Sequence, residues 1–134
     1  MEQTTNTSGK VKTIIYWIVT IFMCFGMGSG GVAQLLKVKE TVEGVTHLGY
    51  PSYILTLFGI WKILGVIAVL VPKFPLVKEW AYAGFFFLMT GALFSHVSSG
   101  DSLGESFGSI MLTVLIVLSW YLRPADRKIA SVNQ

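Results

Sequence analysis

The sequence contains little charge. Only 13% of its 134 residues are Asp, Glu, Lys or Arg, whereas about 25% is usual in a soluble domain. In contrast, 53% of the residues are hydrophobic and the mean hydropathy is +0.66. A soluble domain of this length leaves roughly a third of its unfolded-chain surface exposed, so it cannot hide so many apolar side chains. The composition argues against a soluble globular domain, a disordered chain and a nucleic-acid-binding protein, and it predicts a membrane protein.

Cysteine is nearly absent as well. The one cysteine, Cys24, excludes a disulfide framework, a CxxC redox pair and a cysteine-rich metal site within one chain. The sequence also lacks a Walker loop, a GxGxxG motif after a strand, and paired carboxylates inside an apolar run. We therefore expect no metal site, and a protein that is not an enzyme by itself.

Four long apolar runs are present. A helix needs about 20 mostly apolar residues to cross ~30 Å of hydrocarbon. We therefore predict an all-α, polytopic membrane protein whose bundle of four transmembrane helices occupies residues 13–122, between a disordered cytoplasmic tail over residues 1–12 and a basic cytoplasmic tail over residues 123–134. The predicted spans cover approximately residues 14–32, 51–71, 80–97 and 103–122.

The first run has a second interpretation. Lys10 and Lys12, the apolar run and the small residues at 31–33 also fit a secretory signal peptide with its cleavage site. The uncharged stretch over residues 13–36 is longer than the ~7–15 residues of a signal core, which favours a retained span.

The basic residues predict the orientation. Lys37 and Lys39 lie in the first outer loop, whereas seven of the ten Lys and Arg residues flank the opposite side of the predicted spans. These seven are Lys10, Lys12, Lys73, Lys78, Arg123, Arg127 and Lys128. Because short cytoplasmic loops carry the excess of basic residues, we expect both termini in the cytoplasm.

Small residues predict how the helices pack, since helices in lipid associate through close contact and hydrogen bonds. The candidates are Gly26, Gly30, Gly59, Gly65, Gly84, Gly91, Ser106 and Ser109. In the third span Gly84 and Gly91 share a face with Ala81, Leu88 and Ser95, and we expect this face to meet other helices. Phe85 and its aromatic neighbours then face lipid or a cavity. An alternative for residues 26–31 is a kinked or unwound segment that lines an outward-facing cavity.

The first outer loop carries an amphipathic pattern. Val38, Val42, Val45 and Leu48 recur at helical spacing. The pattern predicts a short helix that lies on the outer membrane surface or folds over the mouth of the bundle.

Lys62 is the one charged residue inside a predicted span. A lysine at the bilayer centre costs about 2.5 to 3.5 kcal/mol on insertion scales, and such residues face the bundle interior and find a partner. The candidate partners are Glu40, Glu43 and Glu105. The functional interpretation is a cation in a ligand site, and the structural interpretation is a polar tie between helices.

Other polar and aromatic residues approach the same outward-facing region. His96 ends the third span and His47 lies in the first outer loop, although an interfacial histidine also serves as a simple polar anchor. Together with Lys62 the candidate ligand-binding residues are His96, His47, Thr90, Ser95 and Trp61.

Four segments resemble the DoxX-like membrane proteins. They are LGYP at residues 48–51, GIWKILG at 59–65, KEWAYAGF at 78–85 and TGALFSH at 90–96. The resemblance covers roughly residues 13–122 and implies a small four-helix protein of the bacterial cytoplasmic (inner) membrane. Some relatives are named as subunits of thiosulfate:quinone oxidoreductase, so the resemblance also points to quinone as a cofactor, and a distant branch assists receptor assembly in animals.

Three functions remain open. The first is a non-catalytic subunit or assembly factor, with a membrane-protein partner or a second copy of the chain. The second is a quinone- or lipid-binding component of a membrane redox system, with its site around Lys62. The third is a pathway for small solutes or ions.

Overall fold

The computed structural model describes residues 2–124, including their side chains from Gly9 onward except that of Glu105. This part of the chain is all-helical, as predicted, and contains no strand. Its five helices are α1 (Glu2–Leu35), α2 (Lys39–His47), α3 (Ile54–Leu70), α4 (Pro75–Ser98) and α5 (Leu103–Leu122).

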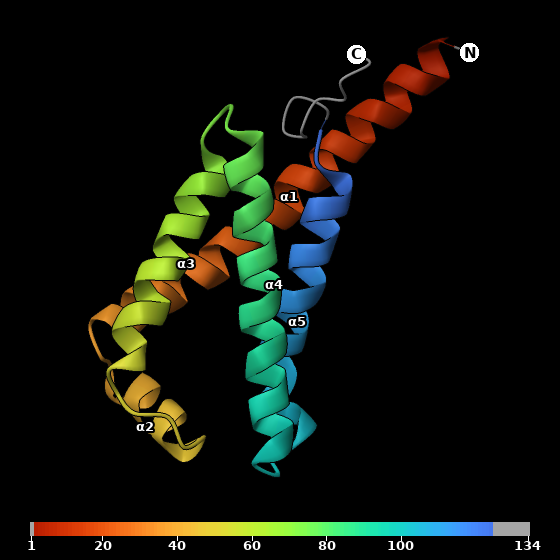
Figure 1. Cartoon of the computed structure of the whole chain (residues 1–134). Helices are drawn as coiled ribbons and strands as arrows, with labels where there is room; N and C mark the ends of the chain where they lie inside the picture. Colours follow the sequence, from red (N-terminus) through yellow and green to blue (C-terminus); the bar gives the residue numbers. More distant parts are fainter. Residues whose placement is uncertain (1, 125–134) are drawn as a thin grey trace.

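The four longer helices contact one another in a ring. Helix α1 lies against α3 and α5, and α4 lies against α3 and α5 from the other side (Figure 1). The start of α1, the α3–α4 turn and the end of α5 lie at one end of the molecule, which we call the terminal end. The α4–α5 connection and α2 lie at the opposite end, the α2 end.

The short helix predicted in the first outer loop is confirmed as α2. It packs against α1 and α3, and none of its residues is fully buried. The expectation of a disordered tail over residues 1–12 differs from the structure, because α1 begins at Glu2. Once an apolar helix has formed, each further residue adds a hydrogen bond without a new nucleation step. Helix α1 also runs unbroken through residues 26–31, so this segment is not unwound.

Prolines set two helix boundaries differently from the sequence prediction. Helix α3 begins at Ile54 rather than at Pro51, because residues 51–53 form a tight turn in which the Ile54 amide donates to the Pro51 carbonyl over 3.2 Å. Helix α4 begins at Pro75 and not near residue 80, since proline suits a first helical position, where no amide partner is needed. Phe74 directly before it has a left-handed φ of 55°, which reverses the chain.

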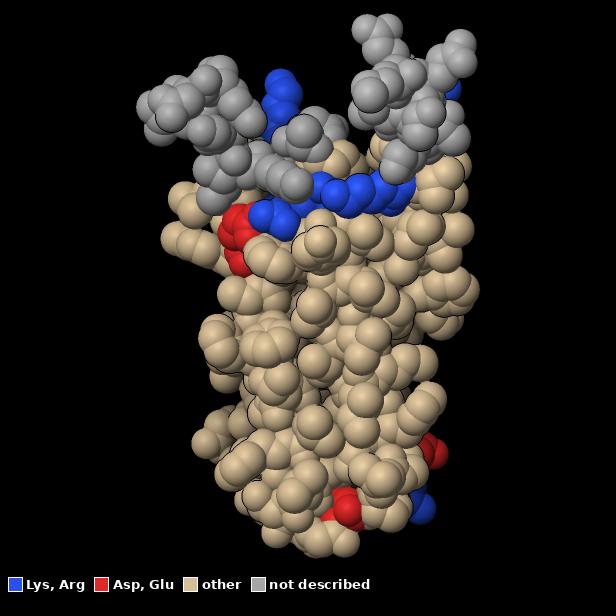
Figure 2. Space-filling view, turned by 90° about the vertical axis from the view of Figure 1, so that its right-hand side faces the viewer, with Lys and Arg blue, Asp and Glu red and all other residues tan. Residues whose placement is uncertain are grey.

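Apolar side chains cover the middle of the molecule, while charged ones gather at its ends. The face in Figure 2 shows Lys and Arg across the terminal end, a broad band without charge, and a few charged side chains at the α2 end. Two helices, α1 from Gly9 and α4, are long and apolar enough to cross a membrane, whereas α3 and the 106–122 part of α5 are shorter apolar helices.

Three of the predicted packing glycines lie at close helix contacts. A Cβ at Gly59 of α3 would lie 2.8 Å from the Gly31 carbonyl oxygen of α1. A Cβ at Gly65 would lie 2.4 Å from the ring of Phe85, and one at Gly26 would lie 2.8 Å from Leu112. Helices α1 and α3 can therefore approach this closely only because both residues at their contact lack a side chain.

Two other predicted packing glycines do not lie at such contacts. A Cβ at Gly84 or Gly91 would have no heavy atom within 4 Å, so the expectation that they seat a neighbouring helix is wrong. Of the two surroundings predicted for Phe85, lipid or a cavity, the structure shows the second, since Phe85 is 3% exposed, packs over Gly65 and lines a hollow between α3 and α4. Gly84 and Gly91 of α4 thus border open space, whereas the Phe85 ring packs against Gly65 of α3.

Buried hydroxyls join three helices in the half of the bundle near the terminal end. Ser119 of α5 lies 2.6 Å from Thr20 of α1 and 2.8 Å from the Tyr82 hydroxyl of α4. Of the two predicted packing serines, Ser106 is buried and donates to the Ser102 carbonyl over 3.2 Å, and Ser109 is half-buried. Polar ties of this kind hold helices together where the surroundings offer no hydrophobic gain.

We expect Gly59→Ala to destabilise the protein by about 1 to 3 kcal/mol, because the new methyl group overlaps the Gly31 carbonyl in a packed contact. Gly108→Ala is the matched control, since a Cβ at Gly108 meets open space and alanine favours a helix. Thermal unfolding of the detergent-solubilised variants measures the difference. Equal stability of Gly59→Ala and the unmodified protein would contradict the close contact.

Candidate functional site

A cavity of about 390 Å³ lies at the α2 end, between α1, α2, α3 and α4. Helix α2 and the residue after it close one side with Val45 and Leu48, which belong to the predicted amphipathic face. The polar side chains of the lining are Gln34, Thr41, Tyr50, Lys62, Ser95 and His96. The volume falls within the range of about 300 to 1,000 Å³ that is typical of ligand sites.

Lys62 enters this cavity from the middle of α3. Its side chain is only 9% exposed, because it belongs to the buried face of that helix. The ammonium lies above α1, where a Cβ at Gly30 would be 3.7 Å from Nζ. The other buried residues of the face are Leu55, Gly59, Gly65 and Val69.

Among the side chains that the structure describes, the Lys62 ammonium has no hydrogen-bond or ion-pair partner. The predicted partners Glu40 and Glu43 do not reach it, so that expectation is wrong for both. Both are exposed on α2, and Glu43 instead lies 3.9 Å from Lys39. The side chain of the third candidate, Glu105, lies outside the described residues.

Gln34 of α1 brings a second unpartnered polar group to the cavity. Its amide oxygen is buried and, within the described chain, accepts no hydrogen bond. Sequence reasoning missed this residue. Its spacing carried a usable signal, because Gln34 follows Gly30 by four residues and therefore lies on the same face of α1, one turn nearer the α2 end.

Tyr50 and Ser95 form a hydrogen-bonded pair in the cavity wall. Their hydroxyl oxygens lie 2.6 Å apart, and the Ser95 hydroxyl also donates to the Gly91 carbonyl over 2.9 Å. Because a serine hydroxyl has one proton, the Tyr50 hydroxyl donates to Ser95. The prediction placed Ser95 at the site, and the structure brings it there together with Lys62 and His96.

Asp101 ties both histidines to the α4–α5 connection. Its carboxylate accepts one hydrogen bond from Nε2 of His47 and one from Nδ1 of His96, each over 2.7 Å. His96 lines the cavity, whereas His47 lies outside its lining and joins the end of α2 to this cluster. Sequence reasoning missed Asp101, which is 7% exposed and is separated from His47 by 54 positions.

Two further predicted site residues lie away from the cavity. Thr90 donates to the carbonyl of Phe86, one turn earlier in α4, over 2.8 Å. Trp61 is half-exposed and faces a second hollow, an apolar groove between α3 and α4.

The arrangement suits binding. Among the described residues, no three His, Cys, Asp or Glu side chains lie close enough together to hold a metal ion. The free groups of the cavity are a cation at Lys62 and an amide at Gln34, and they match a ligand that carries an anionic oxygen and a hydrogen-bond donor.

The family is decided by sequence comparison. The model of the DoxX-like family matches residues 18–120. The chain belongs to the DoxX-like family. This DoxX-like protein is accordingly a membrane protein, in agreement with its apolar helices. No curated protein and no solved structure matches it.

We expect Asp101→Ala to loosen α2 in this DoxX-like protein, because the change removes the carboxylate that holds His47. The rate of hydrogen–deuterium exchange at residues 39–47 should then rise at least several-fold, because local opening of α2 no longer has to break the hydrogen bond between His47 and Asp101. Glu43→Ala is the control, because Glu43 pairs with Lys39 within α2. Equal exchange in both variants would show that the Asp101 cluster does not hold α2.

Proposed function

We propose that this DoxX-like protein binds an amphipathic molecule from the lipid bilayer in the cavity at the α2 end, with Lys62 as the anchor for its polar head. One observation carries the proposal: Lys62 and Gln34 line the same cavity, and neither the Lys62 ammonium nor the Gln34 amide oxygen has a partner among the described side chains. A quinone or a lipid has the size and the polar oxygen atoms for such a site. The bound molecule would complete the hydrogen bonds that the chain leaves open.

Lys78 shows how the same chain satisfies a structural lysine. Lys78 is 1% exposed, and its ammonium donates to the carbonyl of Ala68, over 2.8 Å, and to that of Val71. These carbonyls end α3, where a cation also interacts favourably with the helix dipole. Lys62 is almost equally buried and lies in mid-helix, where backbone carbonyls are already used by the helix. The contrast favours a ligand role for Lys62 over a structural tie.

Helices α1, α3, α4 and α5 each span the membrane in this proposal, and the terminal end lies in the cytoplasm of a bacterium. The support is the distribution of charge: five of the eight basic residues of the described chain lie at the terminal end, and a band without charge on the face in Figure 2 separates them from the α2 end, where Lys37 and Lys39 lie beside Glu40, Glu43 and Asp101. Helix α2 then lies at the outer surface of the inner membrane. Arg127 and Lys128, which the prediction also counted, lie outside the described residues.

The decisive test compares two buried lysines. Protein purified in a mild detergent is extracted, and the extract is analysed by mass spectrometry for quinones and lipids. We expect Lys62→Met to lower the amount of the co-purified quinone or lipid at least tenfold while the protein stays folded. Methionine keeps the apolar bulk of the side chain and removes the anchoring charge.

Lys78→Met is the matched control. We expect it to keep the molecule and to lower thermal stability, since it leaves the carbonyls at the end of α3 without a donor. If Lys62→Met retains as much of the molecule as the unmodified protein, the proposed function is wrong. Enrichment of a membrane-protein partner with no small molecule would favour a non-catalytic subunit instead.

The orientation is tested with single cysteines in a Cys24→Ser background. We expect Gly44→Cys in α2 to react with a membrane-impermeant maleimide on intact cells, and Lys10→Cys in α1 to react only after the cells are opened. Both positions are exposed in the structure, so access depends on the side of the membrane. The reverse pattern would invert the proposed orientation, and labelling of both in intact cells would exclude it.

A further inference from the structure

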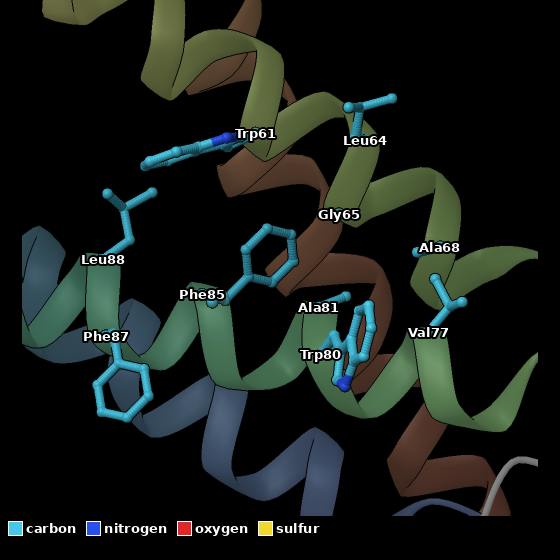
Figure 3. A pocket seen from close by; sticks show the side chains of 11 residues that line it. Trp61, Leu64, Gly65, Ala68, Val77, Trp80, Ala81, Phe85, Phe87 and Leu88 are labelled. Atoms are coloured by element: carbon cyan, nitrogen blue, oxygen red, sulfur yellow. The ribbon is translucent and has the colours of Figure 1, made fainter.

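An apolar groove of about 700 Å³ runs between α3 and α4 (Figure 3). It extends along α4 from Leu88 to Val77, which corresponds to approximately 16 Å at 1.5 Å per residue. Trp61 lies across from Leu88 at one end of the groove, and Trp80 lies near Val77 at the other. The lining contains no charged side chain.

The groove adjoins the polar cavity. Phe87 and Leu88 line both hollows, so the groove and the cavity meet at these two residues of α4. On α3 the neighbouring residues Trp61 and Lys62 face the groove and the cavity respectively. A molecule whose polar head reaches Lys62 therefore has an apolar channel beginning beside that head.

One face of α4 forms the continuous floor of both hollows. Its members lie three or four residues apart, and the first ones line the groove while the last ones line the cavity: Ala81, Gly84, Leu88, Gly91 and Ser95. This is the face that the sequence predicts to pack against other helices. A Cβ at Gly84 or Gly91 would meet nothing within 4 Å, so the small residues leave a hollow instead of a helix contact.

The charge in the cavity points to the kind of head group. The one unpartnered ammonium among the described side chains of the cavity belongs to Lys62, a residue that is 9% exposed, and it matches a single negative charge. The unpartnered amide oxygen of Gln34 can accept a hydrogen bond from a hydroxyl beside that charge. His96 does not add a second free cation, because its Nδ1 already donates a hydrogen bond to the Asp101 carboxylate.

We propose that the molecule bound at Lys62 is a lipid with one negative charge and a hydroxyl-bearing head, and that its hydrocarbon chain lies in the groove between α3 and α4. The head lies in the cavity under α2, and the chain runs from Leu88 toward Val77. This inference rests on the proposed function and adds the class of ligand and the course of its chain.

The proposal is tested by native mass spectrometry with two probes, long-chain phosphatidylglycerol and its dihexanoyl analogue. Long-chain phosphatidylcholine, which has no net charge, serves as the head-group control. We expect the unmodified protein to bind long-chain phosphatidylglycerol at least tenfold more tightly than either of the other two lipids. Equal binding of all three would overturn the proposal.

Gly84→Leu places a side chain at the groove, where its Cβ enters open space. We expect it to weaken binding of long-chain phosphatidylglycerol at least tenfold and to leave the dihexanoyl analogue unchanged. Leu64→Trp, on the α3 side of the groove, should act in the same direction. Gly108→Leu on α5 is the matched control, since Gly108 also has open space and lines neither hollow.

The outcomes separate the two proposals. If Lys62→Met loses both phosphatidylglycerols while Gly84→Leu and Leu64→Trp still bind the long-chain form, the head site stands and the course of the chain is wrong. If Lys62→Met binds both forms normally, the proposed function fails as well. If Gly84→Leu instead releases a second copy of the chain or a partner helix, the groove is a protein interface and the inference is overturned.

Discussion

The close contact between α1 and α3 is the constraint on which the site depends. It exists because Gly31 and Gly59 have no side chains, and a Cβ at Gly59 would lie 2.8 Å from the Gly31 carbonyl oxygen. Lys62 follows Gly59 by three residues on the same buried face of α3. When the two helices meet at the glycines, the lysine must therefore enter the bundle, and its ammonium comes to lie above Gly30.

Burial of Lys62 then sets the electrostatics of the α2 end. A charge in apolar surroundings is stable only with a partner, and within the described chain Lys78 has one while Lys62 does not. Around Lys62 the other polar groups are already paired in large part: Tyr50 with Ser95, and His96 with Asp101. The cavity thus keeps one cation and one amide, at Gln34, for a molecule that enters from outside the chain.

The same helices that create the site also shape access to it. Helix α2 closes one side of the cavity and is held there by the Asp101 cluster, whereas the groove between α3 and α4 adjoins the cavity at Phe87 and Leu88. Gly84 and Gly91 keep α4 from filling this space. Helix α3 therefore packs closely against α1 at Gly31 and Gly59, while its contact with α4 leaves a groove that has room for a hydrocarbon chain.

The sequence by itself determined the class of the protein, its helices and its family. Low charge and long apolar runs predict membrane helices, spacing predicts α2, and a single lysine within an apolar run identifies Lys62, because these properties depend on local composition and periodicity. Periodicity also groups Gly84 with Gly91 on one face of α4. It cannot say whether that face meets a helix or a hollow, because this depends on how far α3 and α4 diverge. Gln34 and Asp101 joined the site only in the tertiary structure, which alone brings α1, α2 and the α4–α5 connection together.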